Sequence, residues 1–69
     1  MEMKDKLLFI RAKMNMSQES LARVLGVSFA TINRWERGHT IPSPRYQVAI
    51  DNFCKENNIV FEDVKKWKN

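Results

Sequence analysis

Three polar side chains that could make specific hydrogen bonds lie close together in one short segment: Asn33, Arg34 and Arg37. If this segment is helical, a rotation of roughly 100° per residue places all three on one face with Ala30, and no acidic residue shares that face. An arginine guanidinium bonds guanine O6 and N7 through two N–H groups, and an asparagine amide reads adenine or holds a phosphate. Each cation that neutralises a phosphate also adds salt-sensitive affinity. The pattern therefore favours a nucleic-acid partner over the alternative of a solvated face without a ligand.

Enzymatic chemistry has little support in the residue types. The chain has one histidine (His39), one cysteine (Cys54) and two glycines. It contains no glycine-rich phosphate loop, no His-Glu-x-x-His motif and no paired cysteine ligands. Glu62 and Asp63 are adjacent, so on a helix they point in different directions and do not form a carboxylate pair. We therefore expect no enzymatic activity, no catalytic or metal-binding residue, no cofactor and no small-molecule substrate.

The elements that must position the polar face are two short amphipathic helices joined by a tight turn, within residues 18–37. Their apolar residues repeat at helical spacing on either side of the turn: Leu21, Ala22 and Leu25, then Val27, Ile32 and Trp35. Gly26 marks the turn, because glycine takes the left-handed conformation at a helix end at little cost. Ser17 and Ser28 are favourable N-caps for the two helices. Helical rotation then predicts that Ser28, Ile32 and Trp35 face the core.

Hydrophobic spacing predicts three further helices, over residues of about 2–14, 44–57 and 61–68. The apolar stripe of the first is Met3, Leu7, Ile10 and Met14, and that of the next is Tyr46, Ala49, Ile50, Phe53 and Cys54. Leu8 and Phe9 lie off the centre of the first stripe, so a wide buried face is expected there. Ser43 is expected to cap the helix that begins with Pro44. Val64 and Trp67 would anchor the last helix, with Trp67 either covering the core or serving an interface. The predicted fold is an all-α, compact five-helix bundle.

Composition limits the remaining possibilities. Sixty-nine residues fit a single domain, 1–69, with one small core. The net charge of +4 favours polyanionic partners, although many small domains are as basic. No apolar run approaches the roughly 18 residues of a membrane span, so no membrane partner is expected. A lone cysteine suits a reducing compartment, and we expect the protein to be cytoplasmic.

The segment MSQESLARVLGVSFATINRWERG, residues 16–38, resembles the phage repressor and Cro helix-turn-helix proteins, the Xre type. The turn glycine of that family matches Gly26, its small helix-crossing residue matches Ala22, and its Trp-Glu-x-Gly ending matches Trp35, Glu36 and Gly38. The resemblance extends from about residue 7 to residue 64. It implies a lambda-repressor-like fold in which the second helix of the motif lies in the DNA major groove.

The resemblance also implies roles for individual residues. Base edges would be contacted by Ser28, Phe29, Ala30 and Arg34, to which the polar pattern adds Asn33. Phosphates would be contacted by Gln18, Arg37, His39 and Thr40. An arginine of the first helix, here Arg11, would pair with Glu36. Familiar members carry long polar residues at the positions of Phe29 and Ala30, whereas apolar side chains there contact a thymine methyl instead. Phe29 is either such a base contact or a core or dimer contact.

These observations predict sequence-specific binding of double-stranded DNA by a transcriptional regulator, a repressor. One module of this size buries roughly 600–1,000 Å² on DNA, so a homodimer on a palindromic operator is the expected arrangement. The alternative is an antitoxin or adaptor module whose main ligand is a partner protein. The outer face of the second motif helix, with two arginines and no acid, favours DNA.

Overall fold

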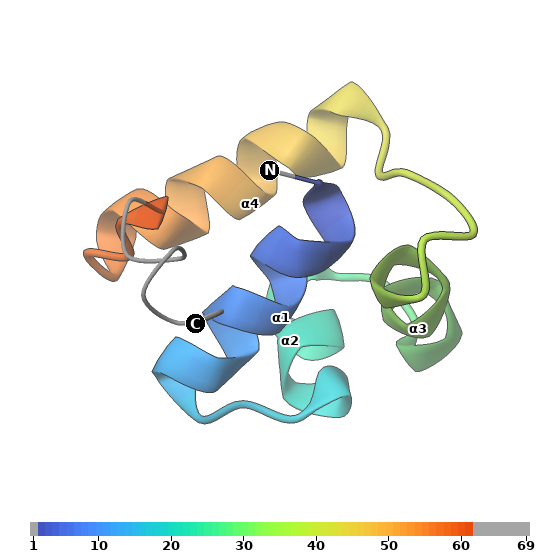
Figure 1. Ribbon diagram of the computed structural model, residues 1–69, viewed down its shortest axis with the longest axis horizontal. Helices are drawn as coiled ribbons and strands as arrows, with labels where there is room; N and C mark the ends of the chain where they lie inside the picture. Colours follow the sequence, from blue (N-terminus) through green and yellow to red (C-terminus); the bar gives the residue numbers. More distant parts are fainter. Residues whose placement is uncertain (1, 62–69) are drawn as a thin grey trace.

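The computed structural model describes residues 2–61, which contain four α-helices and no strand. The helices are α1 (Met3–Met14), α2 (Gln18–Leu25), α3 (Phe29–Glu36) and α4 (Pro44–Glu56) (Figure 1). The all-α class is confirmed, whereas the count of five helices is not. The fifth predicted helix falls, apart from Phe61, on residues 62–68, which lie outside the described residues, as do Val64 and Trp67.

Serine side chains start the two helices of the motif, as predicted. Ser17 Oγ accepts a hydrogen bond from the Ser20 amide at 3.0 Å, and Ser28 Oγ accepts one from the Thr31 amide at 3.1 Å. Ser43 is the N-cap residue of α4, as predicted, but its side chain makes no cap hydrogen bond, unlike those of Ser17 and Ser28. The helix begins with Pro44, as predicted, and the fixed φ of proline suits the first helical turn.

Left-handed residues end the first two helices. Gly26 has φ +72° at the end of α2, as the sequence predicts, and its amide bonds back to the carbonyls of Ala22 and Arg23. Asn15 has φ +53° at the end of α1, where the short polar side chain tolerates a conformation that most residues avoid. Each of these residues ends its helix at a short connection to the next one.

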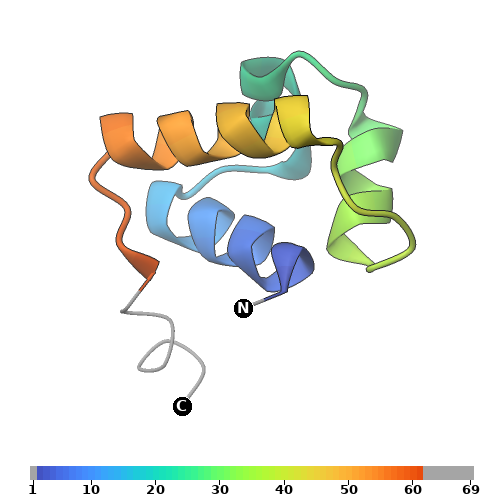
Figure 2. The same cartoon turned by 90° about the horizontal axis from the view of Figure 1, so that it is seen from above.

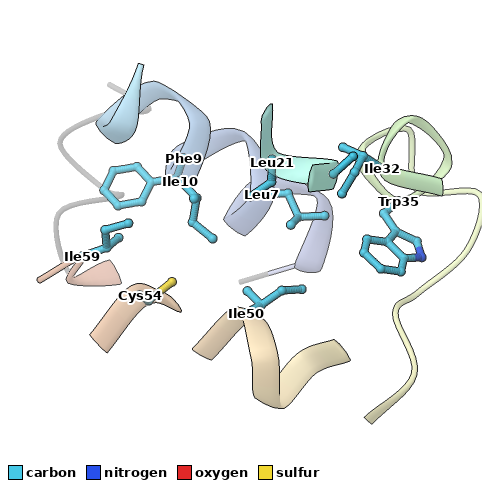
Figure 3. Close-up of a cluster of buried hydrophobic side chains, with 10 residues drawn as sticks. Leu7, Phe9, Ile10, Leu21, Ile32, Trp35, Ile50, Cys54 and Ile59 are labelled. Carbon is cyan, nitrogen blue, oxygen red and sulfur yellow. The ribbon is translucent and has the colours of Figure 1, made fainter. Parts of the chain in front are cut away.

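The core lies between α1, α2 and α4 and extends to α3 (Figure 3). Its most buried side chains are Leu7, Phe9, Ile10, Leu21, Ile32 and Ile50. The wide buried face predicted for α1 is confirmed, since Phe9 is buried and its ring packs 5.8 Å from that of Phe61. The prediction that Ser28 faces the core is wrong: this residue is exposed, because its hydroxyl caps the helix that it precedes.

Helix α3 packs against both α1 and α2 through one side only. Ile32, Trp35 and Glu36 are buried on that side, and the Trp35 ring lies 5.6 Å from the ring of Tyr46 on α4. Figures 1 and 2 place α3 at one end of the molecule, on the side opposite the C-terminal end of α4. Within residues 2–61, no other helix covers the opposite side of α3, where Phe29, Ala30 and Arg34 are exposed. No helix within residues 2–61 has the length and apolar character needed to cross a membrane.

Candidate nucleic-acid interface

The outer side of α3 carries the side chains that the sequence analysis singled out. Phe29, Ala30 and Arg34 are exposed, and Phe29 retains 51% of its accessible surface. Phe29 is therefore not a core residue. Asn33 is half-buried at the edge of the same surface, towards α2. Because Ile32 and Trp35 fix the inner side of the helix in the core, the outer side keeps one orientation relative to the molecule.

The surface continues past the end of α3. Arg37 is the C-cap residue, and His39 and Thr40 follow Gly38, whose φ is +76°. All three side chains are exposed. A glycine fits at position 38 because a left-handed backbone is needed there, which residues with a Cβ rarely adopt. The structure thus places the residues expected to contact phosphate next to those expected to contact bases.

The charge of this surface is positive. The acidic residue of α3 is Glu36, which is buried, with 8% of its surface exposed, and does not face outward. Its carboxylate receives two hydrogen bonds from Arg11, from Nε at 2.8 Å and from Nη2 at 2.9 Å. The pair predicted from the resemblance is confirmed. The outward charges of α3 and its C-cap, Arg34 and Arg37, therefore face no acid on their own helix.

The Gln18 side chain makes hydrogen bonds within the protein that the sequence did not predict. Its Nε2 donates a hydrogen bond to Glu36 Oε1 at 2.8 Å, and its Oε1 accepts a hydrogen bond from Asn33 Nδ2 at 3.5 Å. Gln18 was expected to use its side chain on a phosphate, whereas the structure gives that side chain two partners within the protein. Gln18 lies 18 residues before Glu36, and no local pattern links them, so only the crossing of α2 and α3 reveals the contact.

Ser28 also has its side chain engaged within the protein. Its hydroxyl accepts a hydrogen bond from the Thr31 amide and also lies within hydrogen-bond distance of Thr31 Oγ1, at 2.9 Å. A hydroxyl with two such partners keeps limited capacity for a base. The exposed start of α3 therefore offers mainly the Phe29 ring and the Ala30 methyl, which are apolar groups suited to a thymine methyl.

Cys54 and His39, the cysteine and the histidine considered for catalysis, lie in different surroundings. Cys54 is buried, and burial raises the pKa of its thiol, with a further increase from Asp51. A neutral buried thiol is a poor nucleophile, because the thiolate is the reactive form. His39 is exposed in the loop after α3. Within residues 2–61, no group of histidine, cysteine, aspartate and glutamate side chains could hold a metal ion.

Comparison with known proteins agrees with this arrangement. A family model described as "Helix-turn-helix" matches residues 7–55. An uncharacterized HTH-type transcriptional regulator of Methanocaldococcus jannaschii is 41% identical over 64 residues, covering 88% of this chain and 97% of the relative. Two proteins of Archaeoglobus fulgidus that are also described as uncharacterized HTH-type transcriptional regulators are 37% and 35% identical to this chain. The two alignments cover 94% and 96% of this chain, respectively, and 97% of each relative. No solved structure matches significantly.

Proposed function

The chain belongs to the helix-turn-helix family, and from this premise we propose that it binds duplex DNA in a sequence-specific manner and regulates transcription. The observation that carries the proposal is the outer side of α3, which is exposed, bears Arg34 and is continuous with Arg37. A helix has the width to enter the major groove of B-form DNA. The relatives described as transcriptional regulators align with nearly the whole chain, which supports the same role for it.

In this proposal the residues divide by their place on α3. Phe29, Ala30, Asn33 and Arg34 contact base edges, with Ser28 beside them at the start of the helix. Arg37, His39 and Thr40 contact phosphates, and Gln18 adds a phosphate contact through the second hydrogen of its Nε2. Phosphate contacts fix the register of the protein, and base contacts select the sequence.

The regulatory mechanism we propose is steric repression by a homodimer. Two copies occupy a palindromic operator, and the bound α3 helices exclude polymerase or another regulator from the site. We assign no catalytic step, cofactor or small-molecule substrate to this role, and we treat residues 1–69 as a single domain acting in the cytoplasm. The buried lone Cys54 is compatible with a reducing compartment.

Salt-dependent binding to a labelled pool of random duplex DNA tests this function. We expect retention at low salt that falls linearly on a log–log plot as salt rises, because bound cations displace counterions from the phosphates. Arg37→Ala should weaken retention. Lys55→Ala removes the same charge at an exposed position near the end of α4, far from α3, and should leave retention unchanged. Equal loss in both variants would indicate a general charge effect. Absence of retention by wild type would overturn the proposal and leave a partner protein as the main ligand.

A further inference from the structure

We infer that Gln18 and Glu36 are positioning residues that set the amide of Asn33 to read adenine. The inference rests on the proposed function, because it concerns the same surface of α3. Beyond that function, it names adenine as the base that Asn33 selects and gives the physical reason for this selection. Its basis is a row of four side chains, Arg11, Glu36, Gln18 and Asn33, each hydrogen-bonded to the next.

The first link holds the Glu36 carboxylate still. Arg11 bonds both carboxylate oxygens through Nε and Nη2, at 2.8 Å and 2.9 Å. The Glu36 side chain keeps 4% of its accessible surface, so the carboxylate is largely removed from water. Two parallel hydrogen bonds to a planar guanidinium restrict the orientation of the carboxylate as well as its position.

The second link decides which way the Gln18 amide faces. A carboxylate only accepts hydrogen bonds, so the Gln18 nitrogen, and not its oxygen, must lie against Glu36 Oε1. The separation of 2.8 Å between those atoms fits that assignment. The oxygen of the Gln18 amide is thereby turned away from Glu36, and it lies 3.5 Å from Asn33 Nδ2.

The third link decides which way Asn33 faces. Because Gln18 Oε1 only accepts, Asn33 turns its NH₂ group towards it and uses one N–H there. The other N–H and the Oδ1 oxygen stay available at the edge of the outer surface. Side chains on a helix lean towards the preceding turn, where Ala30 carries only a methyl group. A base edge can therefore approach the Asn33 amide over Ala30.

The remaining edge of Asn33 matches adenine. Adenine presents the N6 amino group as a donor and N7 as an acceptor, which pair with the free Oδ1 and the free N–H. Guanine presents two acceptors, O6 and N7. An unrestrained asparagine could offer both N–H groups to guanine, but here one of them is held by Gln18. The row of hydrogen bonds thus excludes the guanine mode and retains the adenine mode.

Binding-site selection from random duplex DNA, followed by titration of the selected site, tests the inference. Wild type should select an adenine whose preference disappears in Asn33→Ala. Exchange of that A·T pair for G·C should weaken wild-type binding about 5- to 150-fold, the factor for a bidentate base contact. In Gln18→Met the same exchange should have a much smaller effect, while preferences at the other positions persist.

Two further variants control for folding. Gln47→Met makes the same substitution at another half-buried glutamine, one that donates to the Pro42 carbonyl at 2.8 Å, and should leave the adenine preference intact. Asn33→Asp keeps the size of the side chain but removes the donor to adenine N7, so it should lose the preference even if Gln18→Met does not fold.

Each remaining outcome overturns something specific. If Asn33→Ala changes the selected sequence and a folded Gln18→Met does not, the positioning role is wrong. If Gln18→Met weakens all sequences equally and leaves the adenine preference intact, Gln18 contributes only its phosphate contact, and the positioning role is wrong. If wild type enriches a duplex motif without an adenine that depends on Asn33, the inference fails and the proposed function stands. If wild type enriches no duplex sequence, the sequence-specific function falls, and the inference falls with it.

Discussion

Arg34 and Arg37 are both exposed, but they occupy different places on the surface, and we expect their removal to have different effects. Arg34 lies within α3 among the residues proposed to contact bases, whereas Arg37 is the C-cap residue. Arg34→Ala should relax sequence preference at one base pair, by about 1–3 kcal/mol. Arg37→Ala should weaken all sequences alike and reduce the salt slope by about one. Gel-shift titrations at several salt concentrations distinguish the two, and unchanged binding in both variants would contradict the assignment of this surface.

Cys54 is expected to give the stability of the protein a dependence on pH. Burial, and then Asp51, raise the pKa of the thiol in the folded chain. The folded state therefore favours the neutral thiol, so this contribution is complete below the unfolded pKa and is lost as the pH rises through the folded pKa. We expect the melting temperature of wild type to fall more steeply than that of Cys54→Ala above about pH 8.5. Parallel curves for the two proteins would exclude the effect.

At the scale of elements, the Arg11–Glu36 pair fixes α3 to α1. Glu36→Ala should lower the free energy of unfolding by about 3 kcal/mol, because it leaves the Arg11 guanidinium without its partner. We take the lower end of the range for buried pairs, since the Arg11 side chain is 24% exposed. Urea denaturation measures the loss, and Glu19→Ala, at an exposed position of α2, is the control that should change little. Equal stability of Glu36→Ala and wild type would show that the pair is dispensable.

The elements themselves could be predicted because their signals are local. Serine N-caps, the glycine between α2 and α3, and Pro44 at the start of α4 each act within a few residues of their own position. The left-handed backbone of Asn15 and the missing cap hydrogen bond of the Ser43 side chain are also local features, but asparagine and serine are compatible with more than one conformation. The partner of Gln18 could not be predicted, because it depends on where two helices cross. The sequence therefore predicts which residues form the candidate surface but not how their amides are oriented.

At the scale of the whole molecule, the dimensions permit two copies side by side on one DNA duplex. The longest extent is 29 Å, whereas equivalent half-sites on one face are about 34–36 Å apart. We expect native mass spectrometry of the protein with its selected duplex to show two chains per palindromic site. A half-site duplex should bind one chain, more weakly. A single chain on the full site would contradict the proposed homodimer.

The exposure of Phe29, Ala30 and Arg34 has a consequence for engineering. Exchanges of surface residues usually change stability by no more than about 0.5 kcal/mol, and these three side chains lie outside the core. A library that varies them while keeping the inner side of α3 intact should consist mostly of folded proteins. Such a library would allow the recognised sequence to be retargeted on an unchanged scaffold of fewer than seventy residues.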